Sequence, residues 1–180
     1  MRGAHERLDR TARAGVYGRM PLSRRLLSAV APVFLAVLFA HAAPARAGGD
    51  WNDGAITWRS LDEGLAEAKK SGKPVCLVVY TEWCPHCTNY SHVFHDPRVI
   101  EKSKQLVMIR MDKDKHAMTA HGYAPSGDYV PRTVFLSPDG EIRKDVKAKR
   151  EDYPHFYDEK DPASLLGGMD AALAEAKKAA

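Results

Sequence analysis

The chain has 180 residues, of which 28% are charged and 44% are hydrophobic, with 27 Lys and Arg against 23 Asp and Glu. Residues 1–47 hold 8 of the basic residues and 2 of the acidic ones, so residues 48–180 carry a formal net charge of −2. The basic character of the whole chain therefore belongs to its start. This balance predicts no nucleic-acid partner and no cationic face for a membrane surface.

The start of the chain has the pattern of an export leader. Arg24 and Arg25 precede an apolar stretch of 15 residues at 26–40, and Ala45 and Ala47 are small residues at the positions a signal peptidase reads. Because a transmembrane helix usually needs about 20 apolar residues, we expect cleavage after Ala47. An anchor left uncleaved, the alternative, would be the only membrane contact that the sequence predicts.

Removal of residues 1–47 would leave one compact domain at 48–180, which we expect in the periplasm or the extracellular space. Met20 lies just before the leader and is a plausible start, so residues 1–19 are expected to be untranslated or disordered. The compartment beyond the membrane is oxidising, which favours cysteine pairs that cycle between thiol and disulfide.

The sequence of the domain predicts alternating helices and strands. The expected elements are an irregular segment at 48–57 with Trp51 and Trp58 packed on the domain, a helix at 60–72, a strand at 75–80, a helix from Pro85 to about Phe94, a short helix from Pro97, a strand at 106–111, a loop with one helical turn at 113–130, strands at 132–136 and 141–146, a loop at 147–160 and a helix after Pro162. This order predicts an α/β fold, a mixed sheet with helices on both faces.

Two of these helices have an apolar face. In the first helix the expected buried residues are Leu61, Leu65, Ala66 and Ala68. In the last helix they are Leu165, Leu166, Met169, Leu173 and Ala176.

The motif WCPHC at 83–87, directly after the apolar run at 75–80, carries the chemistry. Two thiols three residues apart, where a strand meets a helix, can close a disulfide and open it by exchange. A helix beginning at Pro85 would place Cys84 at its N-cap, where unpaired N–H groups and the helix dipole favour a thiolate. Since the thiolate is the attacking species, Cys84 is the expected reactive sulfur.

Other functions remain open on spacing alone. The pair could be a structural disulfide or half of a zinc site, and Cys84, Cys87, His92 and His95 have a metal-ligand pattern suited to copper or zinc. On a helix, five residues turn His92 well away from Cys87, so we predict no metal site. A chaperone-like protein that binds peptides without redox chemistry is a third possibility.

The third cysteine of the domain, Cys76, lies inside the apolar run at 75–80. A free cysteine in a buried strand behaves as a small hydrophobic residue. We therefore predict that Cys76 is inert and takes no part in exchange.

The order of elements, the Trp-Cys-x-x-Cys motif and a proline before the 132–136 strand resemble the thioredoxin fold over residues 51–178. In that fold this proline is cis and lies against the active-site sulfurs, and it matches Pro131. The fold also usually has an acidic residue six positions before the first active cysteine. Here that position is Val78, and Glu82 is not placed to replace it, so we expect slower deprotonation of Cys87, aided by water or His86.

Further sequence features are similar to the anterior gradient group of small endoplasmic-reticulum thioredoxin-like proteins, which includes thioredoxin domain-containing protein 12. The matching segments are DGAITW at 53–58, GLAEAK at 64–69, KP at 73–74, PSGDYVPR at 125–132 and the aromatic residues Tyr153, Phe156 and Tyr157. The chain departs from the group in its bacterial-type leader and in its ending, KKAA, which is not a retention signal.

The dipeptide Pro85-His86 and the residue Val130 before Pro131 resemble the strongly oxidising DsbA-type oxidases. A positive charge on His86 beside Cys84 would stabilise the thiolate, and so make the disulfide a better oxidant. The alternative is that His86 is an exposed helix residue without a role.

Together these features predict an exported thiol–disulfide oxidoreductase that acts on protein disulfides, by oxidation or isomerisation, with reduction as the alternative. Cys84 attacks or is attacked, and Cys87 resolves the mixed disulfide. Pro131 lines the sulfurs, the backbone of Val130 pairs with an extended substrate, and Trp83 packs beside the pair and limits access of water. The reaction needs no cofactor. The substrates are proteins with thiols or disulfides, and the recycling partner and oligomeric state are not predicted.

Overall fold

The computed structural model describes residues 48–179, so the predicted leader at 1–47 lies outside the described residues. In chain order the elements are β1 (Trp58–Arg59), α1 (Leu61–Ser71), β2 (Val75–Tyr80), α2 (Pro85–Ser91), the 3-10 helix η1 (His92–His95), α3 (Pro97–Ser103), β3 (Val107–Asp112), α4 (Ala117–Gly122), β4 (Arg132–Leu136) and α5 (Ala163–Ala179). None of the helices within 48–179 has the length and hydropathy needed to cross a membrane.

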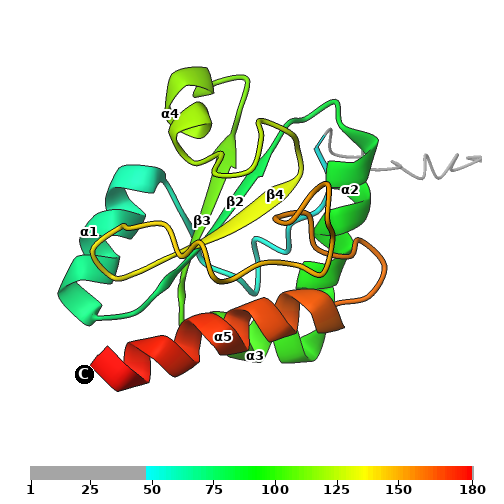
Figure 1. Cartoon of the computed structure of the whole chain (residues 1–180). Coiled ribbons are helices and arrows are strands. Elements are labelled where there is room, and N and C mark those ends of the chain that lie inside the picture. Colours follow the sequence, from blue (N-terminus) through cyan, green and yellow to red (C-terminus); the bar gives the residue numbers. More distant parts are fainter. Residues whose placement is uncertain (1–47, 180) are drawn as a thin grey trace, which may run out of the picture. The chain divides into compact units, whose positions relative to one another are not determined.

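A mixed sheet lies at the centre of the domain, where Figure 1 labels β3, β2 and β4. It has four strands in the order β1-β3-β2-β4. Strands β1 and β2 both pair with β3 in parallel, and β4 pairs with β2 in antiparallel orientation. Cys76 of β2 stands in register with Met108 of β3 and Phe135 of β4. The predicted mixed sheet is confirmed, and β2, one of its two inner strands, leads to the cysteine motif.

The two faces of the sheet are covered by different helices, as predicted. Along β2, Cys76 and Val78 point into the core formed with α2, α3 and α5. Val75, Leu77 and Val79 point to the opposite core, formed with α1 and α4. Because both faces are covered, β2 is apolar at successive positions instead of at alternate ones.

Helix α1 follows its predicted caps and, with the exception of Ala66, its predicted apolar face, since Ala68 is buried and Leu61 and Leu65 pack against the core. Ser60 and Glu63 form the capping box at its start, and Gly72 ends it with a left-handed φ of 69°. Gly64 and Ala68 are buried, and a side chain at position 64 would meet Ile109 of β3 at 2.4 Å. The absence of a side chain at Gly64 therefore lets the helix lie close against the sheet. The expectation that Ala66 is buried is wrong, since this close approach turns Ala66 to solvent.

The predicted strand at 141–146 is wrong. Only one bridge, between Leu136 and Ile142, extends the sheet here. The N–H of Arg143 still donates to the carbonyl of Phe135, but the next turn is closed by Val146 N–H donating to the carbonyl of Arg143. This turn buries the side chain of Val146 in the core, and so ends pairing with β4.

Smaller differences concern element ends. The short strand β1 was not expected, and α2 changes to a 3-10 helix at His92–His95, the last part of the predicted helix. The single helical turn expected at 113–130 is present as α4.

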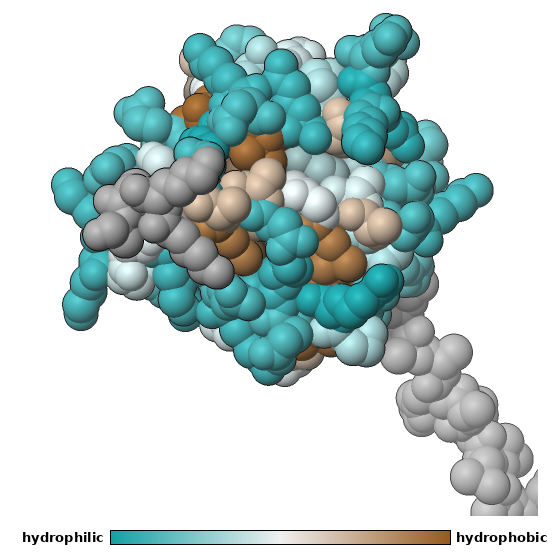
Figure 2. All heavy atoms as spheres, turned by 60° about the horizontal axis from the view of Figure 1, so that its bottom comes forward, coloured by the Kyte–Doolittle hydropathy of each residue, from teal (hydrophilic) through white to brown (hydrophobic). Residues whose placement is uncertain are grey.

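The C-terminal helix α5 begins after Asp161, whose Oδ1 accepts the N–H of Ala163 at 2.9 Å. Its buried side includes Leu165 and Met169, as predicted, together with Ala172. Figure 2 views the molecule from the α3 and α5 side of Figure 1, and most of this face is hydrophilic, with smaller hydrophobic areas between the polar side chains.

Candidate active site

Cys84 lies where β2 has ended and α2 begins. It is the N-cap of α2, with extended backbone angles, and Pro85 occupies the first helical position. The Sγ of Cys84 accepts the backbone N–H of Cys87 at 3.3 Å. The predicted N-cap placement is therefore confirmed, and a helix N–H points at the sulfur that is expected to react.

Both cysteines of the pair are free thiols in this structure. Cys84 is 4% exposed and Cys87 is fully buried, so the attacking and resolving sulfurs differ only slightly in exposure. Burial is the main cause that raises the pKa of the Cys87 thiol, and its hydrogen bond with Cys84 raises that pKa further. In the reduced form, Cys87 therefore keeps its proton at neutral pH.

The Val130–Pro131 peptide bond is cis, as predicted, and Pro131 is buried. The Sγ of Cys84 donates to the carbonyl oxygen of Val130 at 3.8 Å. Residues 46 positions apart in the sequence thus meet at the sulfur. The structure brings Cys84, Cys87, Val130 and Pro131 together at one end of the sheet.

Arg132 holds this neighbouring segment in place, a role that the sequence analysis missed. The side chain is buried, and its guanidinium donates to the carbonyls of Ala120, Tyr123 and Tyr129 and to the carboxylate of Asp128. These hydrogen bonds connect α4 to the segment that leads to Pro131. The sequence signal was a charged residue at the first position of an otherwise apolar strand.

The prediction that Trp83 packs beside the pair and limits the access of water finds no support in the position of its side chain, which lies mostly in solvent. The ring of Trp83 is 71% exposed, and its Nε1 donates to the Oδ2 of Asp114 at 2.7 Å. That hydrogen bond turns the indole toward the turn after β3. Trp83 is therefore a surface group beside the site, available to a molecule that docks there.

His86 lies on the exposed side of α2, where the segment before α5 contacts it. Its Nδ1 is 2.9 Å from the Oε2 of Glu159, and its ring contacts Phe156 edge to face. Neither contact could be found from the sequence, because 70 or more residues separate the partners. The predicted stabilisation of the thiolate by His86 stays a prediction.

The surroundings of Cys87 match the expectation drawn from Val78. Val78 is fully buried and apolar, and Glu82 is exposed and forms an ion pair with Lys115 at 2.6 Å. Tyr90 and Thr133 form a buried polar pair in this region, with their hydroxyl oxygens 2.8 Å apart. Glu82 thus serves a surface ion pair and does not reach Cys87's side of the sheet.

Cys76 is fully buried in the sheet, as predicted. Burial raises the pKa of its thiol, which leaves it protonated. It forms no disulfide, and the core around it is formed mainly by apolar and aromatic side chains. A protonated, enclosed thiol does not exchange with a disulfide in solution.

Within residues 48–179, no group of three or more His, Cys, Asp or Glu side chains is placed to hold a metal ion. The rings of His92 and His95 are 6.5 Å apart and both residues are exposed, whereas Cys87 is buried. The metal-ligand pattern in the sequence therefore does not come together in space.

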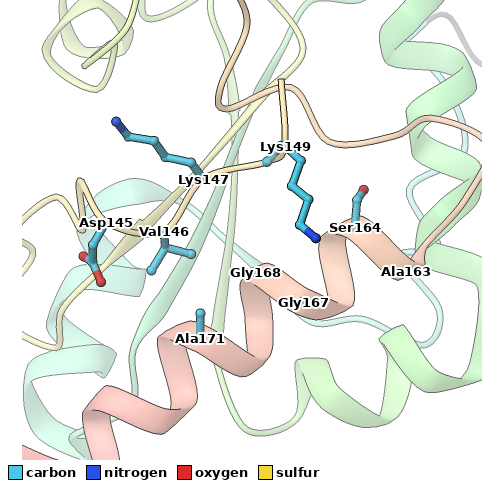
Figure 3. A pocket seen from close by; sticks show the side chains of 10 residues that line it. Asp145, Val146, Lys147, Lys149, Ala163, Ser164, Gly167, Gly168 and Ala171 are labelled. Carbon is cyan, nitrogen blue, oxygen red and sulfur yellow. The ribbon is translucent and has the colours of Figure 1, made fainter. Parts of the chain in front are cut away.

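A cavity of about 470 Å³ lies away from the cysteines, between the segment at 145–149 and helix α5 (Figure 3). Lys147 and Lys149 stand at its side, and the small residues Gly167 and Ala171 form the helix side. None of its lining residues belongs to the cysteine motif or to the Val130–Pro131 segment.

Comparisons with known proteins agree with this geometry. A family model described as "Thioredoxin-like" matches residues 57–138. Anterior gradient protein 2 homolog of Homo sapiens is 31% identical over 127 residues, which are 68% of this chain and 69% of that protein. Anterior gradient protein 3 of Mus musculus is 31% identical over 124 residues, or 68% and 74% of the two chains.

Two solved structures share the fold. A thioredoxin from Thermus thermophilus has a TM-score of 0.54 at 22% identity, over 69% of this chain and 92% of its own. The DsbH oxidoreductase has a TM-score of 0.50 at 18% identity, over 71% and 88%. The two anterior gradient relatives, each 31% identical over 68% of this chain, show the family: the chain belongs to the anterior gradient family of thioredoxin-like proteins.

Proposed function

We propose that this protein is an exported thiol–disulfide oxidoreductase that acts on protein substrates through Cys84 and Cys87, in the direction of oxidation or isomerisation. The observation that carries the proposal is the Cys84 sulfur at the helix N-cap, with the N–H of Cys87 on one side and the carbonyl of Val130 on the other. The thioredoxin-like family and the fold shared with an oxidoreductase support it.

The oxidation reaction follows from the two sulfurs. In the disulfide form, a substrate thiolate attacks the Sγ of Cys84, the bond between Cys84 and Cys87 breaks, and Cys87 leaves as a thiolate that takes up a proton. A second substrate thiolate then attacks the substrate sulfur of the mixed disulfide. The substrate gains a disulfide, Cys84 leaves as a thiolate, and the pair is left reduced by two electrons.

The residues around the pair supply a surface for an extended substrate. The backbone of Val130 lies beside the Cys84 sulfur and can pair with a substrate strand, as in β-augmentation. Trp83, the first residue of the motif, is exposed and offers an apolar contact for a substrate side chain. We assign substrate binding to Val130 and Trp83, and assign Pro131 to the surface beside the sulfurs. His86 is assigned to tuning the pair.

Trapping of the mixed disulfide tests the exchange chemistry. Cys87→Ser should leave Cys84 joined to substrate proteins, because the resolving thiol is gone, and Cys84→Ser should form no such species and lose activity in insulin reduction and in refolding of a reduced, disulfide-containing protein. Cys76→Ala is the matched control and should retain both activities. Equal trapping by Cys84→Ser and Cys87→Ser would contradict the assignment.

The direction of the reaction is tested by the equilibrium of the pair with glutathione. A reduction potential between about −120 and −180 mV would support oxidation or isomerisation. A value near −270 mV, that of a cytosolic reductant, would instead support the reductase alternative. Fractionation of cells that express the full chain, with the size of the mature protein measured, tests the export and cleavage of the leader.

Simple variants distinguish the proposed function from two alternatives, a metal carrier and a peptide-binding chaperone. Replacement of His92 and His95 together should leave the redox activity unchanged if our proposal holds, and abolish stoichiometric metal uptake if the domain is a metal carrier. If the protein is only a peptide-binding chaperone, Cys84→Ser should suppress aggregation of unfolded substrates as well as the wild type does.

A further inference from the structure

Tyr153 is a large aromatic side chain that the fold leaves in contact with solvent. Of the residues that the structure describes, three large hydrophobic side chains are exposed: Trp83, Met118 and Tyr153. The side chain of Tyr153 is 49% exposed. Because single exposed hydrophobic residues are common on protein surfaces, exposure alone gives Tyr153 no role. Its position relative to the cysteine motif does.

Tyr153 packs on the segment that reaches the Cys84 sulfur. Its ring meets the ring of Tyr129 edge to face, with the ring centres 5.0 Å apart. Tyr129 directly precedes Val130, whose carbonyl oxygen lies 3.8 Å from the Sγ of Cys84. The ring of Tyr129 is held in place, since its hydroxyl accepts the N–H of His155 at 2.9 Å. Tyr153 therefore lies one aromatic contact away from the backbone that we assign to substrate binding.

The turn that carries Tyr153 also contacts the helix of the cysteine motif. The N–H of Phe156 donates to the carbonyl of Tyr153 at 2.9 Å, which closes the turn. The ring of Phe156 meets the imidazole of His86 edge to face at 5.8 Å. Figure 1 shows this part of the chain, in orange, beside α2. The turn thus contacts both α2 and the segment that leads to Val130, and these two contacts hold Tyr153 beside the site of exchange.

An extended substrate paired with Val130 would bring one of its side chains to Tyr153. The substrate cysteine must lie at the Sγ of Cys84 for exchange, and an extended chain advances about 3.3 Å per residue. The Cα atoms of Val130 and Tyr129 are about 3.8 Å apart, as in any trans peptide. Since the Tyr153 ring lies against the ring of Tyr129, a side chain about two or three residues from the substrate cysteine can reach it.

We propose that Tyr153 is a specificity-determining residue that binds a large apolar side chain about two or three residues from the reacting cysteine of a protein substrate. This deepens the proposed function and rests on it. Folded proteins bury most such side chains, so the substrate that Tyr153 selects is a chain that has not finished folding. A thiolate of that chain attacks the Sγ of Cys84 in the disulfide form, and Cys87 leaves as a thiolate that takes up a proton.

The test uses two peptides that each have a single cysteine. One has phenylalanine two residues from the cysteine on both sides, and the other has serine at the same places. Each peptide is mixed in excess with the oxidised protein, and the rate at which the Cys84–Cys87 disulfide is lost is measured. The ratio of the two rates is the preference for the apolar side chain. Since both peptides attack the same sulfur, this ratio does not depend on the reactivity of Cys84.

We expect the wild type to prefer the phenylalanine peptide about threefold to tenfold, the effect of one aromatic contact. For Tyr153→Ser the preference should fall below about twofold, because the ring is gone. Tyr153→Phe keeps the ring and should keep the preference. If Tyr153→Ser does not fold, Tyr153→Gln, which keeps more of the side-chain volume, provides the same test.

Met118→Ser is the matched control, because Met118 is an exposed apolar side chain on α4. It should keep the preference of the wild type. The same preference in the wild type and in Tyr153→Ser, or an equal loss in Met118→Ser, would overturn the proposal. The proposed function fails in a different way: the disulfide would then be reduced by glutathione and by neither peptide, and the role of Tyr153 would fall with it.

Discussion

The two sides of the cysteine pair are built in different ways. On one side, β2 and α2 are regular elements that continue directly into the motif, and backbone hydrogen bonds place Cys84 and Cys87. On the other side, the segments at 113–131 and 141–162 contain one short helix, and side-chain contacts from Arg132 and Glu159 hold them in place. The chemistry is thus local to the motif, whereas its surroundings depend on a few polar contacts.

This difference has a consequence for substitution. Substitutions in β2 or α2 act directly on the sulfurs, whereas substitutions in the irregular segments act on the residues beside the sulfurs.

The largest effect on the irregular side is expected for Arg132. Arg132→Met removes the buried donor of three carbonyls and leaves the Asp128 carboxylate without its guanidinium, so we expect a loss of about 3 kcal/mol in the free energy of unfolding. The control is Lys113→Met, which removes a partly exposed partner of the same carboxylate and should cost less than about 1 kcal/mol. Urea unfolding measures both, and equal losses would contradict the role of Arg132.

The side of the pair formed by β2 and α2 is tested by how the reaction of Cys87 depends on pH. Because the pKa of this thiol is raised, only a small fraction is thiolate at neutral pH, and that fraction rises about tenfold per pH unit. The release of glutathione from a Cys84–glutathione mixed disulfide should therefore speed up about tenfold per unit between pH 6 and 8.5. Rapid acid quenching with mass spectrometry measures the rate. A flat profile above pH 7 would show that Cys87 is already ionised there.

Two neighbouring glycines of α5 test its packing on the irregular side. A side chain at Gly168 would meet Phe135 at 2.7 Å and the Tyr157 hydroxyl at 2.8 Å, so Gly168→Ala should lower the free energy of unfolding by about 2 kcal/mol. At Gly167 nothing lies within 4 Å, and Gly167→Ala should raise it by about 0.5–1 kcal/mol through helix propensity. Thermal unfolding of the two variants decides the point, and opposite signs are the expected result.

The smallest effect concerns His155, which is buried in the 147–160 segment with no hydrogen-bond partner for either ring nitrogen. Burial lowers its pKa, with Lys147 and Arg132 adding to the effect. The unfolded chain then binds a proton below about pH 6.5 that the folded protein does not, so stability falls as pH falls through that value. Between pH 7.5 and 5.5 the wild type should lose about 1 kcal/mol more than His155→Asn.

The exposed His116 provides the control for this last prediction. His116→Asn should keep the pH dependence of the wild type, because the buried imidazole of His155 is still present in this variant. If His155→Asn loses stability with acid as steeply as the wild type does, the dependence comes from other groups.

The sequence alone determined the elements that rest on local rules. Apolar runs predicted β2, β3 and β4, the capping box predicted the start of α1, and the position of Pro85 predicted Cys84 as N-cap. The cis Val130–Pro131 bond came from the resemblance to a known fold and is present. These features could be predicted because they depend on hydrogen bonds between residues close in sequence and on the periodicity of side chains within short segments.

Only the tertiary structure decided the rest. Ala66 faces solvent because Gly64 lets α1 approach Ile109, and residues 141–146 leave the sheet because Val146 is drawn into the core. The exposure of Trp83 depends on a hydrogen bond to Asp114, 31 residues away. Glu159 reaches His86 across 73 residues. Contacts between residues so far apart in the sequence depend on how the elements pack, and a local sequence pattern cannot predict them.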